Sequence, residues 1–205
     1  LPKSHKANKT NIAVRTSGPT ASVGLARGEI ILTLPGWPRD KKMARGTLDR
    51  LTGLWMHELC HVAFTDFDQW KEAVAAKLSN LVNGLEDARI EAEADNRGLF
   101  VEMPKRMGEL FDVMGEELGQ DLTDMDPNDP RSLPYVLSIT GRAALGNDCM
   151  KPAARRLWDA MTRETKATVR ETLDGLKRCK STADVLELAK TLAAKPAPEQ
   201  EPKQA

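Results

Sequence analysis

The sequence has few of the residues that mark several common classes of protein. Its 205 residues include only 3 cysteines, and their odd number and wide spacing exclude a disulfide framework and favour a reducing compartment. Aromatic residues make up 4% of the chain, so platforms for stacking nucleic-acid bases are scarce. No run of about 18 apolar residues predicts a transmembrane helix, and no apolar segment follows the basic first residues as in a secretory signal. We therefore expect a cytoplasmic protein that has no membrane partner.

Net charge is also absent, because 30 basic and 30 acidic residues cancel. The zero is a sum of unlike segments: residues 1–50 carry +7, residues 51–100 carry −5, residues 101–150 carry −6 and residues 151–205 carry +4. We interpret the segments as solvated faces of opposite sign. Basic ends would also suit a nucleic-acid partner, but without interleaved aromatic residues we do not expect one.

The distribution of apolar residues predicts an α+β fold that is mostly helical. Residues 11–35 alternate in the manner of strands, and Ala26-Arg27-Gly28 can turn a hairpin between residues 22–25 and 29–34. Helical spacing follows in 47–64, 67–97, 104–118, 132–145, 151–162, 164–178 and 182–194. We therefore expect a small N-terminal hairpin or sheet packed on the first helix, and a helical C-terminal half.

Four regions follow from this pattern. Residues 1–10 are basic and polar and predict a flexible arm, while residues 195–205 are rich in proline and predict a disordered tail. Between them we expect a core domain at 11–103 and a helical subdomain at 104–194.

The strongest pattern in the chain is His57-Glu58-Leu59-Cys60-His61. On a helix, residues four apart lie on one face, so two imidazoles in this spacing can bind one Zn²⁺. Glu58 can then act as general base on a metal-bound water. The chain's own composition predicts roughly 0.002 chance occurrences of this motif. Cys60 points to one side of the histidine pair, and we interpret it as a packing residue.

Zinc needs a third protein ligand, and the acidic stretch 83–95 is the obvious source. Two registers fit its helical spacing: Asp87 as ligand with Glu91 orienting a histidine, or Glu91 as ligand with Asp95 behind it. Glu86 is a third candidate.

A straight helix from residue 67 to Asp87 would be roughly 30 Å long and would carry the carboxylate away from the histidines. We therefore predict a break near Ser79-Asn80 or Gly84. A single unbroken helix over 67–95 would exclude these third ligands.

Residues 57–67, together with Leu81-Val82-Asn83-Gly84-Leu85-Glu86-Asp87-Ala88-Arg89-Ile90-Glu91, resemble the metallopeptidase-like segment of some von Willebrand A proteins, including relatives of the cobaltochelatase large subunit. The resemblance covers about residues 50–97. It implies a zincin-type site with His57, His61 and Glu58, and with Asp87 or Glu91 as third ligand. It also implies an edge strand beside the metal that pairs with an extended peptide substrate, for which we name residues 29–34.

Two functions of different classes follow. The first is a zinc-dependent metallopeptidase that hydrolyses a peptide or protein substrate, with Glu58 as general base. The alternative is a metal-stabilised, inactive interaction module that binds a protein partner in a larger assembly. A nucleic-acid-associated protein that uses the basic ends is a third reading, which strong salt-dependent binding would support.

Overall fold

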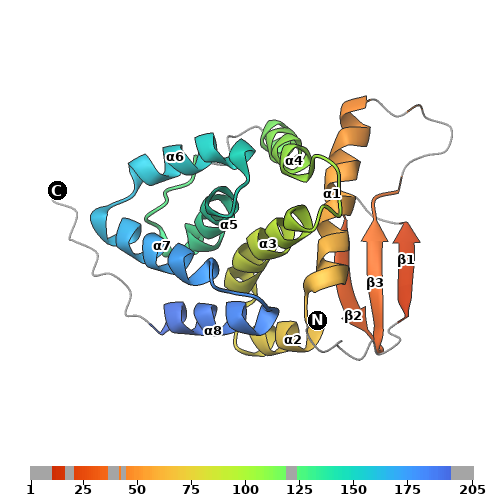
Figure 1. Cartoon of the computed structure of the whole chain (residues 1–205), viewed down its shortest axis with the longest axis horizontal. Coiled ribbons are helices and arrows are strands. Elements are labelled where there is room, and N and C mark those ends of the chain that lie inside the picture. The colour runs from red at the N-terminus through yellow and green to blue at the C-terminus, as the bar shows by residue number, and fades with distance from the viewer. Residues whose placement is uncertain (1–10, 17–20, 37–41, 43–44, 119–123, 195–205) are drawn as a thin grey trace.

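The computed structural model describes residues 11–16, 21–36, 42, 45–118 and 124–194, and the predicted arm and tail lie outside them. Figure 1 shows a small sheet at one end, a long helix beside it, and a helical body beyond. The strands are β1 (Ile12–Thr16), β2 (Ser22–Ala26) and β3 (Glu29–Leu34). The helices are α1 (Arg45–Phe64), α2 (Phe67–Ala75), α3 (Ser79–Asn96), α4 (Met103–Leu118), α5 (Leu133–Ala144), α6 (Lys151–Ala160), α7 (Arg163–Leu176) and α8 (Thr182–Ala193), with short 3₁₀ turns at Pro130–Ser132 and Asp148–Met150. The predicted α+β, mostly helical fold is confirmed.

The sheet contains the predicted hairpin and one further strand. β2 and β3 pair antiparallel around Arg27 and Gly28, whose φ angles of 52° and 79° are those of a tight hairpin turn. β1 pairs parallel with the other side of β3, so the strand order is β1-β3-β2. The expectation that residues 29–34 form an edge strand is therefore wrong, because β1 occupies the edge that the hairpin leaves open. The edge strand nearest to α1 is β2.

The chain breaks between α2 and α3, next to the predicted position at Ser79. Asp66 caps α2 by accepting hydrogen bonds from the backbone of Asp68 and Gln69. At the other end Lys77 adopts a φ of 59°, and the Leu78 N–H returns to the carbonyl of Ala73 at 2.8 Å. This turn ends α2 after nine residues, and α3 then starts in a new direction.

Gly84, the other position considered for the break, lies inside α3 and serves packing instead. A Cβ atom there would lie 2.3 Å from the carbonyl oxygen of Pro134, so only glycine allows α5 this close to α3. The close contact continues at Gly141 of α5, where an added Cβ would lie 3.1 Å from the Cβ of Ala88 in α3. The approach of α5 to α3 determines which side chains meet at the site below.

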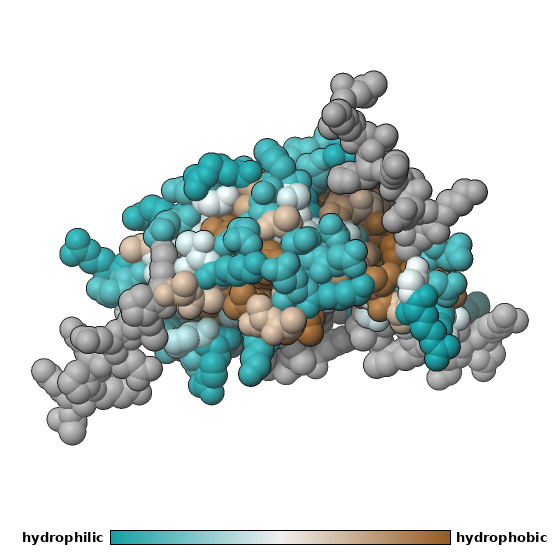
Figure 2. Space-filling model, turned by 90° about the horizontal axis from the view of Figure 1, so that it is seen from below, coloured by the Kyte–Doolittle hydropathy of each residue, from teal (hydrophilic) through white to brown (hydrophobic). Residues whose placement is uncertain are grey.

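Two groups of buried apolar side chains lie on either side of α3. The smaller joins α1, α3 and α4 through residues such as Cys60, Ile90 and Met107. The larger joins α3 to the C-terminal helices, with Leu85 and Leu137 fully buried in it. Hydrophilic side chains cover most of the face shown in Figure 2, and hydrophobic ones appear between them and toward the sheet. Helix α4 packs directly on α1, and the boundary proposed at residues 103 and 104 stays a prediction.

Among the described residues, no helix is both long and apolar enough to span a membrane.

Candidate metal centre

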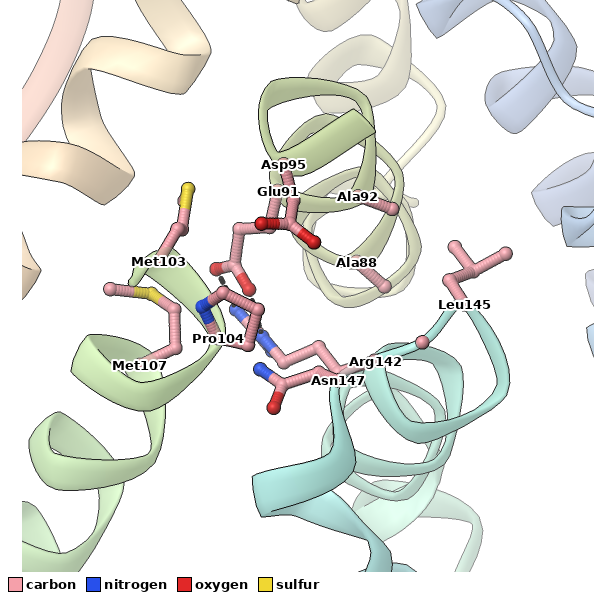
Figure 3. A pocket seen from close by; sticks show the side chains of 11 residues that line it. Ala88, Glu91, Ala92, Asp95, Met103, Pro104, Met107, Arg142, Leu145 and Asn147 are labelled. Atoms are coloured by element: carbon pink, nitrogen blue, oxygen red, sulfur yellow. Dashed lines mark hydrogen bonds and ion pairs between the residues drawn. The ribbon is translucent and has the colours of Figure 1, made fainter. Parts of the chain in front are cut away.

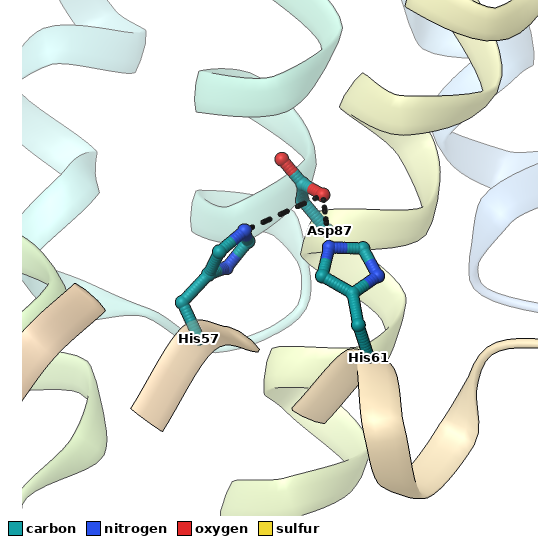
Figure 4. A group of neighbouring side chains, drawn as sticks. All are labelled: His57, His61 and Asp87. Atoms are coloured by element: carbon teal, nitrogen blue, oxygen red, sulfur yellow. Dashed lines mark ion pairs between the residues drawn. The ribbon is translucent and has the colours of Figure 1, made fainter. Parts of the chain in front are cut away.

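Helix α1 presents His57 and His61 on one face, as the spacing predicts. Their ring centroids lie 4.9 Å apart and their planes are nearly perpendicular, at 88°. His61 Nε2 lies 3.2 Å from Asp87 Oδ1, and His57 Nε2 lies 3.8 Å from the same oxygen. Figure 4 shows the two rings on α1 turned toward the carboxylate, which comes from α3. One ligand atom from each of the three residues lies within 4.8 Å of the others, so the group could hold a metal ion.

Glu91 forms a hydrogen bond with the Nδ1 atom of the His57 ring. Its Oε1 lies 2.8 Å from His57 Nδ1, and both of its oxygens accept hydrogen bonds from Arg142, at 2.6 and 2.7 Å. Figure 3 shows Arg142 reaching from α5 to Glu91 on α3, with Met103 and Met107 of α4 alongside. Arg142 also lies 3.5 Å from Asp87 Oδ2, hydrogen-bonds Ser138 and stacks on the ring of Phe111. One buried guanidinium thus orients both carboxylates.

A second chain of hydrogen bonds holds the His61 ring. His61 Nδ1 lies 2.9 Å from Thr65 Oγ1, and the Thr65 hydroxyl donates to Glu86 Oε1 at 3.2 Å. Glu86 is fully buried and also accepts hydrogen bonds from Arg89 and from the Thr182 hydroxyl. Because Thr65 has one hydroxyl hydrogen and gives it to Glu86, its oxygen accepts a hydrogen from His61 Nδ1. This places the lone pair of His61 on Nε2.

The resulting arrangement calls for a cation. Glu91 and Thr65 lie against the Nδ1 atoms, so whenever a ring is neutral its Nε2 lone pair faces Asp87 Oδ1, and a proton or a metal ion must lie between them. Asp87 Oδ1 is buried and has no hydrogen-bond partner in the described part of the chain, whereas Oδ2 accepts hydrogen bonds from Asn83 at 3.2 Å and from Arg142 at 3.5 Å. An unpaired buried acceptor is costly unless a proton or a metal ion occupies the space before it. Two imidazoles and a carboxylate, each held by a second residue, form a donor set that suits zinc and similar divalent metals.

The charges of the site shift its pKa values strongly. Burial opposes a charge on His57, but Asp87 and the hydrogen bond to Glu91 outweigh burial and raise the pKa of His57 to about 9. Burial likewise opposes ionisation of Asp87, but His57, His61 and Arg142 hold its pKa far below the usual range. Arg142 and His57 overcome burial at Glu91 in the same way and lower its pKa. Both carboxylates are therefore charged at neutral pH although they are buried.

Glu58 lies at the wall of the same cleft as His57 and Asp87. Only 8% of it is exposed, and its carboxylate accepts a hydrogen bond from the backbone N–H of Val23 in β2. Burial raises the pKa of Glu58, against the opposing attraction of the two histidines. A raised pKa brings a carboxylate closer to the range in which it can take up and return a proton at neutral pH. The cleft has a volume of about 590 Å³, which is in the usual range of ligand-binding pockets.

The structure separates the candidates for the third ligand. It matches the register in which Asp87 faces the histidines and Glu91 orients one of them. Asp95 is exposed, and Glu86 is engaged by Arg89 and lies behind His61. Cys60 is fully buried, with its sulfur 3.9 Å from that of Met103, in agreement with a packing role.

Sequence reasoning did not identify Arg142, Thr65 or Thr182 as parts of the site. Arg142 carried a visible signal, since it is the single charged residue in the largely apolar segment 133–145. A charge in such a segment indicates a buried partner. The two threonines carry no comparable signal, because threonines are common at helix ends.

No protein-family model matches the chain, and no curated protein or solved structure matches it. The candidate site is therefore supported by its own geometry.

Proposed function

We propose that the protein is a zinc-dependent metallopeptidase. The observation that carries the proposal is the convergence of His57 Nε2 and His61 Nε2 on Asp87 Oδ1, a buried oxygen without a hydrogen-bond partner among the described residues, beside Glu58 in an open cleft. The resemblance of this segment to zincin-type sites points to the same chemistry. Zinc bound there would polarise a peptide carbonyl and make an attacking water more acidic.

Each residue of the site has a proposed role that follows from its contacts. Glu58 takes the proton of the attacking water and later gives it to the leaving amine, which its raised pKa favours. Glu91 and Thr65 keep the hydrogens of the histidines on Nδ1 and leave Nε2 for the metal. The edge strand β2 runs beside Glu58 and offers its backbone to an extended peptide.

The test is a Glu58→Gln variant of the full chain, compared with the parent protein and with Glu164→Gln, an exposed position on α7. We expect the parent and Glu164→Gln to bind about one zinc ion and to cleave peptides. Glu58→Gln should bind zinc equally well and lose about 100-fold or more in kcat, the scale of general-base catalysis. Metal content is measured by elemental analysis and cleavage with a library of quenched fluorescent peptides. A parent protein without bound zinc, or one whose cleavage survives Glu58→Gln, refutes the proposal.

A metal-stabilised interaction module makes a different prediction. It would bind zinc, cleave none of the peptides, and retain its protein partner in the Glu58→Gln form.

A further inference from the structure

The cleft beside the metal group extends along α3. Ser79, Asn80, Asn83, Asp87 and Glu91 all line it, so its floor follows this helix for about three turns. Asp87 lies toward one end of this row. Asn83 and Asn80 lie roughly 6 and 10 Å from it along the helix axis, at 1.5 Å per residue. The cleft therefore continues well past the residues that would perform the chemistry.

The walls at the far end of the cleft are apolar. Trp70 and Val74 of α2 form one wall, and Pro134 and Tyr135 of α5 form the other. Val74 is 54% exposed and Tyr135 is 65% exposed. Single exposed apolar side chains are common, but several that gather along one cleft commonly mark a binding site.

The charges along the cleft are unevenly distributed. Among the described residues that line it, the acidic ones are Glu58, Asp87 and Glu91, all at the metal group. The far end has one cation, Arg131, which is paired with Asp129 at 2.6 Å and points to solvent. Its floor carries the neutral polar groups of Ser79 and Asn80, which can hydrogen-bond a peptide backbone.

We infer that this end of the cleft, which we call the α2–α5 pocket (Trp70, Val74, Pro134 and Tyr135), binds a large apolar side chain of the substrate. The inference rests on the proposed peptidase function and adds its specificity. An extended peptide advances about 3.4 Å per residue, so the pocket is reached two or three residues from the scissile bond. Leucine, methionine or phenylalanine is the expected residue there, because it would cover the apolar walls, whereas aspartate or glutamate would lose part of its hydration without covering them as well.

Binding can be measured apart from catalysis. The probes are two short peptides that end in a hydroxamate, a group that binds zinc, with leucine or aspartate two residues from it; acetohydroxamate is the probe without a side chain. We expect the zinc-loaded full chain to bind the leucine compound at least about 10-fold more tightly than the aspartate compound, as for burial of one apolar group. Two variants separate the pocket from the metal: Val74→Asp, and Val101→Asp as a matched control at an exposed valine between α3 and α4.

The outcomes distinguish the inference from the proposed function. Val74→Asp should weaken the leucine compound about 10-fold and leave acetohydroxamate unchanged, while Val101→Asp should change neither. Equal affinity for the leucine and aspartate compounds, or an equal effect of both variants, overturns the pocket even if the protein cleaves peptides. A preserved leucine preference without cleavage of any peptide overturns the peptidase function and supports the pocket.

Discussion

Replacing Thr65 by valine removes the hydroxyl group behind His61 and keeps the shape of the side chain. The oxygen lies 2.9 Å from His61 Nδ1 and donates its hydrogen to Glu86 at 3.2 Å. A metal on Nε2 requires the ring hydrogen on Nδ1, and in the variant this buried N–H loses its acceptor. An unsatisfied buried donor costs about 1–3 kcal/mol. The metal-loaded state therefore bears this cost in full.

The metal-free state can avoid most of it. Without a metal the ring can carry its hydrogen on Nε2, which faces Asp87 Oδ1 at 3.2 Å, an oxygen that lacks a partner. Only the hydrogen bond to Glu86 is then lost, which costs about 0.5–1.5 kcal/mol. We expect zinc affinity to fall by about 10- to 100-fold, as for other groups that orient a ligand histidine. This corresponds to about 1.4–2.7 kcal/mol.

The two effects are measured separately. Competition with a chromophoric chelator gives the zinc affinity, and urea unfolding with a strong chelator present gives the stability of the metal-free protein. Thr65→Ser should restore zinc affinity, whereas Thr52→Val, which removes a hydroxyl bound to the carbonyl of Leu48 on the same helix, should leave it unchanged. Zinc affinity equal to that of the parent in Thr65→Val would show that this hydroxyl does not control the His61 ring.

Three further predictions concern stability. Gly84→Ala should destabilise the protein by about 1–3 kcal/mol or more, because the new methyl group meets the Pro134 carbonyl, whereas Gly24→Ala has open space and should not; urea unfolding compares them. Ser181→Ala removes the cap of α8 and should cost about 1 kcal/mol in the same assay, with unchanged zinc affinity. Zinc at about 100 times its Kd should add about 2.7 kcal/mol and raise Tm by about 5–10 °C in calorimetry, and His61→Ala should abolish the rise.

The parts of the structure that sequence could predict are those that depend on short-range geometry. The spacing of His57 and His61 places both on one helical face, and the turn at Arg27-Gly28 suits a hairpin. The break before Ser79 followed from a length argument, since a straight helix would have separated Asp87 from the histidines. Each of these inferences uses residues that are neighbours in sequence or in one helix.

The parts that sequence could not predict depend on long-range packing. Arg142 lies 51 residues from Glu91, and it reaches the site only because Gly84 lets α5 approach α3. The parallel pairing of β1 with β3 leaves no mark in the alternation of either strand, so the sequence alone does not show that residues 29–34 lie between two strands. The choice between Asp87 and Glu91 as ligand also depends on packing, because the placement of α3 against α1 brings Asp87 to the Nε2 atoms and Glu91 to Nδ1 of His57.

The charges of the buried site indicate which ion it favours. Glu58, Asp87, Glu91 and Arg142 are each no more than 8% exposed. With both imidazoles neutral, three carboxylates and one guanidinium leave a net charge of −2. A proton on His57, which its raised pKa favours, compensates half of this charge, and a divalent metal compensates all of it. Without Arg142 the same dication would leave a negative charge in the interior, which is costly. The arginine therefore allows a site with three carboxylates, which we propose to be a general base, a ligand and the support of His57, to be neutral when it holds one divalent ion.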